Sequence, residues 1–383
     1  MKFNIKHLSL YFFLICVYTI SYGQPTQRME QKVQASLDSL QRANGFPGVT
    51  CAILLPSGKT LAVASGVADS LKQTPMHPNH RMLAGSIGKT FFAAAAMVLA
   101  EKGVFNLDDK IETFIGGEPW FSRIPNARTI TMRMLLNHTS GIEEYYELGD
   151  FMERLKNHPE KVWTPLETIA YIFDRKPLFA AGEGWGYADA NYLIMGYILE
   201  KITGQRMYAL AKQYALKPYK LNATEPSLKL SFKQLATGYS AETSPFPFHG
   251  PMVKNDKLVF NPQFEWTGGG FVSSATDLAK WMKELYHYSF ISEANREQMR
   301  MGVAANTGKE HRYGLGLQIR PSLDFGWSYG HSGWFPGYVS DAAYFPEAKI
   351  SIALQFNTDN GQRLRKQTYS YLVDLMKLIK EDM

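Results

Sequence analysis

The sequence is poor in cysteine and has no repeat or strongly charged segment. Only two cysteines occur among 383 residues, too few for the disulfide framework of a small secreted domain. Cys16 lies near the N-terminus, and Cys51 lies in an apolar segment, where we expect a buried thiol. The formal charge of +6 at pH 7 is mild and spread along the chain, so it gives no basis for nucleic-acid binding.

Motifs for nucleotides and metal ions are also missing. The chain has no Gly-x-x-x-x-Gly-Lys-Ser/Thr and no strand-linked Gly-x-Gly-x-x-Gly. Of nine histidines, only His77 and His80 are close in sequence, and their proline-containing loop has no carboxylate at ligand spacing. We therefore expect no cofactor and no metal ion.

The N-terminus has the pattern of a secretory signal. Lys2 and Lys6 precede an apolar run over residues 8–20, and small residues follow it. The run is short for a membrane span. We expect a signal peptide over residues 1–23, whose removal takes away two lysines and no acid and lowers the formal charge from +6 to +4. The mature protein would be secreted or periplasmic, without stable membrane insertion. An uncleaved anchor is the alternative, and Ile15 disfavours a lipoprotein at Cys16.

Strand patterns occur at both ends of the chain and helical patterns occur between them. This order predicts an α/β (α+β) fold in which an antiparallel sheet, flanked by helices, is completed by both termini and a mostly helical domain is inserted. The sheet part is expected over about 29–85 and 255–383, and the helical part over about 86–254. Expected elements are helices at 29–44, 193–202 and 364–380, and strands at 48–55, 60–64, 313–319, 337–345 and 350–356.

Ser86 and Lys89 form the single Ser-x-x-Lys of the chain. Two residues three apart on a helix share a face, so the lysine nitrogen can reach the serine hydroxyl. A serine becomes a strong nucleophile when a neighbouring base takes its proton. The apolar run that follows predicts that Ser86 starts a helix, where backbone N–H groups favour negative charge.

A second polar segment is Tyr187-Ala188-Asp189, which follows Gly184 and Gly186 and precedes a predicted helix. A phenol beside an ammonium group can pass protons. Taken alone, the segment is more typical of a helix cap by Asp189 with Tyr187 as packing.

A third segment, His331-Ser332-Gly333-Trp334, is expected at the start of an edge strand. Glycine in a strand allows close approach of a ligand to the backbone. A backbone N–H of this strand and that of Ser86 could together bind an oxyanion. Taken alone, the segment also fits a loop histidine before a turn.

In this order, the three segments resemble the motifs of the serine β-lactamase and penicillin-binding-protein superfamily. The resemblance is to the branch of class C β-lactamases, D,D-peptidases and esterases, with motifs Ser-x-x-Lys, Tyr-x-Asn and Lys/His-x-Gly. It covers roughly residues 30–380 and includes Phe46-Pro47-Gly48, residues 130–141 and residues 268–278.

The resemblance implies roles for the site residues. Ser86 would be acylated, Lys89 would activate it, and Tyr187 would share proton transfer to the leaving group. Backbone N–H groups of Ser86 and Trp334 would hold the oxyanion. Asp189, His331, Ser332 and Gly333 would complete the substrate-binding surface.

Two residues depart from the family pattern. Asp189 replaces the usual asparagine, and its carboxylate would pair with Lys89 and favour the charged ammonium, which makes the lysine less certain as the base. His331 replaces the lysine of dedicated class C β-lactamases and is more typical of the D,D-peptidases and esterases.

The sequence therefore predicts an exported serine hydrolase that acts on esters or on D-amino-acid-containing peptides through acyl-Ser86. Its partner would be a small-molecule or peptide substrate, recognised in part by the loops Glu143–Phe151 and Ser240–Val253. The alternatives are a β-lactamase proper and a weakly catalytic penicillin-binding sensor or scaffold. The sequence does not fix the oligomeric state.

Overall fold

The computed structural model describes residues 27–381. The expected signal peptide over residues 1–23 lies outside this range. Within it, no helix combines the length and the apolar character that crossing a bilayer requires.

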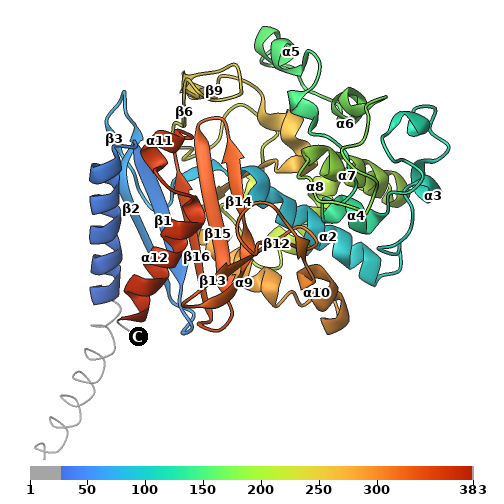
Figure 1. Ribbon diagram of the computed structural model, residues 1–383. Coiled ribbons are helices and arrows are strands. Elements are labelled where there is room, and N and C mark those ends of the chain that lie inside the picture. The colour runs from blue at the N-terminus through green and yellow to red at the C-terminus, as the bar shows by residue number, and fades with distance from the viewer. Residues whose placement is uncertain (1–26, 382–383) are drawn as a thin grey trace, which may run out of the picture.

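The largest element is a nine-stranded sheet in which every neighbouring pair is antiparallel. Its first strand in sequence pairs with its last, so segments from both ends of the chain meet in the middle of the sheet (Figure 1). The order across the sheet is β11 (Val303–Ala304), β12 (Arg312–Tyr313), β13 (Gln318–Ser322), β14 (Gly326–Phe335), β15 (Tyr338–Phe345), β16 (Ile350–Phe356), β1 (Gly48–Leu54), β2 (Thr60–Asp69) and β3 (Thr74–Pro75). This confirms the predicted fold class.

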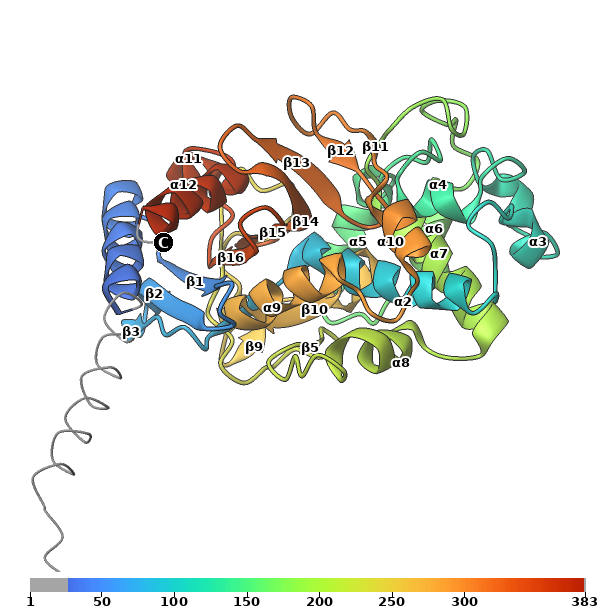
Figure 2. The same cartoon turned by 90° about the horizontal axis from the view of Figure 1, so that it is seen from below.

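Helices cover both faces of the sheet. A helix over residues 27–44 and α12 (Thr368–Lys380) lie on one face, while α9 (Ala275–Tyr286) and α2 (Lys89–Glu101) lie on the other (Figure 2). Alternate residues of β1 point to opposite faces, as the period of a strand requires. Cys51 and Ile53 therefore belong to the core beneath the terminal helices, and Ala52 to the larger core around α2. Cys51 is a buried free thiol, as expected.

A row of alanines forms the surface against which α9 packs. Ala342, Ala353, Ala52 and Ala62 lie side by side on β15, β16, β1 and β2. The helix packs across all four of these strands. Small side chains in register leave room for a helix to lie close to a sheet, and the bulky residues of the same strands face the terminal helices instead.

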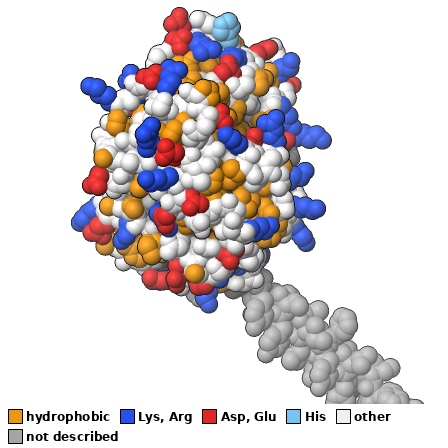
Figure 3. Space-filling model, turned by 90° about the vertical axis from the view of Figure 1, so that its right-hand side faces the viewer, with side chains coloured by type: hydrophobic (Ala, Val, Ile, Leu, Met, Phe, Trp, Pro, Cys, Tyr) orange, Lys and Arg blue, Asp and Glu red, His pale blue; other side chains and the backbone are white. Residues whose placement is uncertain are grey.

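The helical part lies on the side of the sheet opposite the helix over residues 27–44, at the right in Figure 1. On the face that this part presents, acidic and basic side chains are interspersed without an extended field of one sign (Figure 3). Its helices are α3 (Glu112–Ile115), α4 (Met132–Leu136), α5 (Phe151–Asn157), α6 (Pro165–Ile169), α7 (Asp189–Thr203) and α8 (Met207–Ala211), with α10 (Glu293–Arg300) at its border with the sheet.

A small three-stranded sheet connects the two parts. Its order is β4 (Arg81–Leu83), β10 (Phe271–Ser274) and β5 (Glu225–Pro226), with Leu83 opposite Val272. Because β4 and β10 are antiparallel, the end of β4 lies beside the start of β10. The residues that follow β4, including Ser86, therefore lie beside the glycines 268–270 that precede β10.

Three expected elements were wrong in detail. The strand expected at 313–319 is two strands, β12 and β13, separated by a turn in which Gly316 has φ +80°. The helix expected at 364–380 is α11 (Gly361–Leu364) and α12, separated where Arg365 has φ +60°. His331 lies in the middle of β14 rather than at the start of an edge strand.

A buried ion pair links the sheet to α12. Arg320 on β13 and Asp341 on β15 form a bidentate pair at 2.8 and 2.9 Å, with side chains 3% and 1% exposed. Thr368 at the start of α12 donates a hydrogen bond of 2.8 Å to the same carboxylate.

We expect Asp341→Ala to lower the free energy of unfolding by about 3–5 kcal/mol, because it leaves the Arg320 guanidinium buried without its counter-charge. Denaturant titration measures this loss. Asp174→Ala removes the partner of Arg123 in a pair whose side chains are 52% and 61% exposed, and it should change the unfolding midpoint little. Equal effects of the two substitutions would contradict the assignment.

Candidate active site

Ser86 lies in a single 3-10 turn, η1 (Gly85–Gly88), that leads into α2. Lys89 is the first residue of α2 and is fully buried. Its Nζ lies 3.0 Å from Ser86 Oγ. The predicted proximity of the hydroxyl and the amine is therefore present, although Ser86 belongs to the turn before the α-helix.

Lys89 Nζ has three hydrogen-bond partners. Besides Ser86 Oγ they are Asp189 Oδ1 and the carbonyl oxygen of Gly268. The last two can only accept, whereas the serine hydroxyl can donate or accept. The same geometry therefore suits an ammonium that donates to all three partners and a neutral amine that accepts the Ser86 proton. Proton transfer from Ser86 to the neutral amine would give the ammonium form together with a Ser86 alkoxide.

Asp189 is the first residue of α7, yet its side chain does not cap that helix. The carboxylate pairs with Lys89 instead. The backbone N–H of Asp189 donates to Glu144 Oε2, so a second buried acid anchors the start of α7. The capping interpretation of Asp189 was wrong, because the buried ammonium is the stronger partner for a carboxylate at this position.

Tyr187 is partly buried beside Lys89 and lines the Ser86 cavity, and its hydroxyl oxygen is buried. Lys89 Nζ lies 4.8 Å from the centre of its ring, and the His138 ring stacks against it at 4.3 Å. Burial raises the pKa of the Tyr187 phenol well above its usual value, and the charge of Asp189 raises it further. Tyr187 is therefore a neutral phenol, able to donate a proton rather than to hold negative charge.

His331 is buried and held between two neighbours. Its Nε2 lies 2.7 Å from the Tyr313 hydroxyl, and its Nδ1 contacts the carbonyl oxygen of Ser332. Because a carbonyl oxygen only accepts, Nδ1 carries the proton and Nε2 accepts from Tyr313. Burial first, and then the charge of Lys89, lower the pKa of His331 to about 3. The histidine is therefore uncharged near neutral pH, unlike the lysine it replaces.

The second half of β14 forms one wall of the site. The partner strand β13 pairs with β14 only as far as Gly330, so His331–Phe335 pair with β15 alone. Gln318 at the start of β13 contacts Ser332 instead, accepting from its backbone N–H at 3.1 Å. The edge character expected for this segment is thus restricted to the half of β14 that carries the third motif.

Two glycines bring this wall against the Ser86 turn. Gly85 has φ +54°, and a Cβ there would lie 2.6 and 2.7 Å from Trp334 O and N. A Cβ on Gly333 would overlap the carbonyl oxygen of Ala84. The backbones of Ser86 and Trp334 are therefore neighbours, the arrangement that an oxyanion site built from their N–H groups requires.

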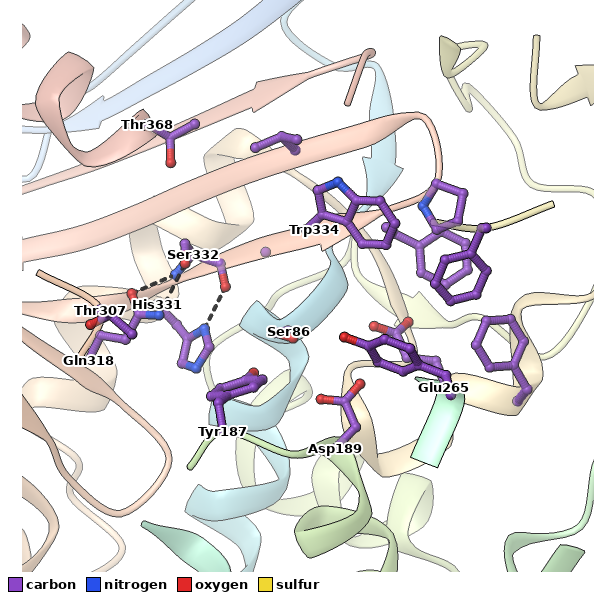
Figure 4. Close-up of a pocket in the computed structure, with 17 residues that line it drawn as sticks. Ser86, Tyr187, Asp189, Glu265, Thr307, Gln318, His331, Ser332, Trp334 and Thr368 are labelled. Carbon is purple, nitrogen blue, oxygen red and sulfur yellow. Dashed lines mark hydrogen bonds between the residues drawn. The ribbon is translucent and has the colours of Figure 1, made fainter. Parts of the chain in front are cut away.

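A cavity of about 360 Å³ opens onto Ser86. In Figure 4, Asp189 and Glu265 lie on one side of Ser86, and His331 and Ser332 lie on the other. The expected loops Glu143–Phe151 and Ser240–Val253 each contribute one lining residue, Tyr146 and Phe246. Aromatic side chains make up much of the lining: Tyr146, Tyr187, Phe246, Phe264, Trp334 and Phe335.

Glu265, Glu144 and His138 were missed by the sequence analysis. Glu265 lies in η6 (Pro262–Gly268), is 4% exposed and lines the cavity. The signal that could have found it is an acid between Phe264 and Trp266, just before the glycines 268–270. Glu144 and His138 lie behind Asp189 and Tyr187 in the helical part. Among residues 27–381, no three His, Cys, Asp or Glu side chains are grouped as metal ligands.

We expect Gly85→Ala to slow labelling of Ser86 by a fluorophosphonate at least tenfold, because a Cβ would push the Ser86 turn away from Trp334. Gly103→Ala is the matched control: Gly103 also has a positive φ, +71°, but nothing lies within 4 Å of its Cβ position. It should keep the labelling rate. Equal labelling rates in the two variants would show that the close approach is unimportant.

The buried Glu265 carboxyl predicts a pH-dependent stability. Burial, and then the charge of Asp189, raise its pKa from 4.5 to about 8. Between these values the folded protein keeps a proton that the unfolded chain releases, so stability falls as pH rises. Relative to Glu265→Gln, the wild type should lose stability from about pH 4.5 to about pH 8, with no further relative change outside this range. Parallel curves of unfolding free energy against pH would contradict this.

Comparison with known proteins places this geometry in a family. The Beta-lactamase family profile matches residues 27–375. Penicillin-binding protein 4* of Bacillus subtilis is 27% identical over 320 residues, which are 82% of this chain and 68% of that protein. A D-aminopeptidase of Brucella anthropi is 24% identical over 82% of this chain and 57% of its own length.

A solved structure agrees with these sequence matches. A D-stereospecific amidohydrolase from Streptomyces sp. is 26% identical and superposes with a TM-score of 0.75, covering 89% of this chain and 99% of that one. The resemblance inferred from the three motifs is thereby confirmed, and the chain belongs to the β-lactamase family, within the superfamily of serine hydrolases that also contains the penicillin-binding proteins.

Proposed function

We propose that this protein hydrolyses ester or amide bonds, including those of D-amino-acid derivatives, through an acyl-Ser86 intermediate. The observation that carries the proposal is the single nitrogen of Lys89, which contacts Ser86 Oγ at 3.0 Å and is fixed by Asp189 and Gly268 at the base of an open cavity. The names of the relatives, a D-aminopeptidase and a D-stereospecific amidohydrolase, support amides as substrates.

The reaction has two acyl transfers. Ser86 Oγ bonds to the substrate carbonyl carbon while its proton passes to the neutral amine of Lys89. The oxyanion accepts from the backbone N–H groups of Ser86 and Trp334. The bond to the leaving group breaks as that group takes a proton through Tyr187 or Lys89. Water then adds to the acyl carbon, gives up its proton by the same route, and releases the acid and Ser86.

Charge in the cavity favours this proposal over a β-lactamase or a D,D-carboxypeptidase. Substrates of both those classes carry a free carboxylate. The described residues that line the Ser86 cavity include no lysine or arginine that could pair with such a carboxylate. Of the two acids in the lining, Asp189 is paired with the buried Lys89, and Glu265 keeps a proton near neutral pH because burial raises its pKa to about 8. His331 is uncharged near neutral pH because burial lowers its pKa.

The cations of an adjoining cavity are engaged elsewhere. This cavity, of about 520 Å³, adjoins the first at Gln318 and Ser332 and is bordered by Arg320, Arg365 and Lys366. Arg320 is paired with Asp341. Arg365 donates to the carbonyl oxygen of Ala43, and Lys366 pairs with Asp374. These contacts favour neutral or cationic substrates at Ser86.

We keep two untested expectations as part of the proposal. Export is supported by the basic and apolar pattern of residues 1–23. A weakly catalytic penicillin-binding sensor is the second candidate, and it would be acylated without being turned over.

Ser86→Ala should reduce turnover at least about a thousandfold, because the nucleophile is lost. The assay uses a short-chain p-nitrophenyl ester, phenylalanine amide of either hand, a D-Ala-D-Ala peptide and a cephalosporin. Mass spectrometry should find the acyl group on Ser86 in the wild type.

Ser57→Ala, in an exposed turn, is the matched control and should keep full activity. Turnover that survives Ser86→Ala would refute the nucleophile. Stoichiometric acylation by the cephalosporin without turnover of any substrate would establish the sensor instead.

A further inference from the structure

Glu265 is a cavity residue that the acyl-transfer steps do not use. It projects from η6 toward the Ser86 cavity, on the same side of Ser86 as Asp189 (Figure 4). The turn that carries it is strained, since the next residue, Trp266, has φ +38° and ψ −119°. Such strain in a non-glycine residue persists where surrounding structure holds it, often at functional sites.

The two carboxylate oxygens of Glu265 have different surroundings. Oε1 lies against Gly269, where a Cβ would overlap it, and the backbone of Gly270 supplies a hydrogen bond to the carboxyl group. Oε2 is buried and has no hydrogen-bond partner in the structure. A buried carboxylate oxygen without a partner is costly, and here it belongs to a side chain that lines a cavity.

The nearest cation does not satisfy this oxygen. Lys89 Nζ is committed to Ser86, Asp189 and Gly268. Asp189 lies on the same side of the cavity, and its charge is paired with Lys89. Without a cation bound beside it, Glu265 keeps its proton near neutral pH, because burial raises its pKa to about 8. A cationic donor that enters with the substrate would supply the missing partner of Oε2, and Glu265 would release its proton to solvent as the cation binds.

The chemistry of the walls indicates what kind of cation fits. Tyr146, Phe246 and Phe264 line the cavity with Glu265, and aromatic faces attract organic cations as well as apolar groups. Gly269 separates Glu265 from the Ser86 turn, since its Cβ position also lies 2.7 Å from Gly85 O. A cationic group bound to Glu265 is thus held close to the nucleophile, as an α-amino group is close to the carbonyl carbon of its own amino acid.

We propose that Glu265 binds the α-ammonium group of the substrate's acyl part, and so selects amino-acid amides and esters with a free amine. This inference rests on the proposed hydrolase function, and it adds a specificity residue to that function.

Two p-nitroanilide substrates test this proposal. One is phenylalanine p-nitroanilide, as the D or the L form, and the other is 3-phenylpropanoyl p-nitroanilide, which lacks the amino group. The wild type should prefer the amine-bearing compound in kcat/KM. Glu265→Gln keeps the shape but cannot become a carboxylate when the cation binds, and it should lower that preference about 10- to 100-fold, the range expected for a charge-assisted hydrogen bond.

Glu144→Gln is the matched control. Glu144 is also buried near Asp189, but it accepts from the backbone N–H groups of Tyr145 and Asp189 and does not line the cavity. It should affect both substrates alike and leave the preference in place. A preference that is lost in Glu144→Gln and kept in Glu265→Gln would overturn the assignment.

A binding measurement separates this inference from the reaction. Calorimetric titration of Ser86→Ala should detect phenylalanine amide at least tenfold more tightly than 3-phenylpropanamide, and Glu265→Gln in that background should abolish the difference. If the p-nitroanilides are cleaved but neither preference exists, the inference fails and the hydrolase stands. If nothing is cleaved but the binding difference and its loss are observed, the hydrolase fails and the ammonium site stands.

Discussion

The site depends on a lysine that is buried at the boundary of two parts of the fold. A buried ammonium needs a counter-charge and acceptors for its protons. The two parts meet so that Asp189 of α7 and the carbonyl of Gly268, before β10, supply them. The third direction of the Lys89 nitrogen is left for Ser86. The position of Ser86, the proposed nucleophile, is thus fixed by the same contacts that stabilise the buried charge of Lys89. Asp189 therefore contributes both to folding and to the proposed chemistry.

The other side of the site is formed by close packing between the backbone of the Ser86 turn and that of β14. The Ser86 turn follows β4, and Trp334 lies in the half of β14 that has no partner on one side. Glycine at 85 and 333 removes the Cβ atoms that would hold the two segments apart. Short unpaired strand segments are normally a liability, but here the open half of β14 forms the wall of a cavity.

The balance of charge distinguishes this cavity from one made for anionic substrates. The family's third motif often carries a lysine, whereas His331 is neutral here because burial lowers its pKa, with its ring fixed by Tyr313 and Ser332. Acids line the opposite side of Ser86. An aromatic cavity with a neutral histidine and a buried carboxyl group, and with no lysine or arginine among the described residues that line it, is suited to substrates with positive charge near the bond to be broken.

The sequence by itself determined the fold class and the proximity of Ser86 and Lys89, which are the proposed reacting residues. The Ser-x-x-Lys spacing depends only on helix geometry, and strand patterns at both ends of the chain predict a sheet closed by its termini. Local patterns could not reveal that Glu265 and Glu144 belong to the site, because the role of a single acid depends on its burial and on the side chains that the tertiary structure packs around it. They also misplaced His331, since whether a strand is free along an edge depends on where its neighbour ends. Only the tertiary structure decided which partners Lys89 has and what charge the cavity carries, because burial and long-range contacts set both.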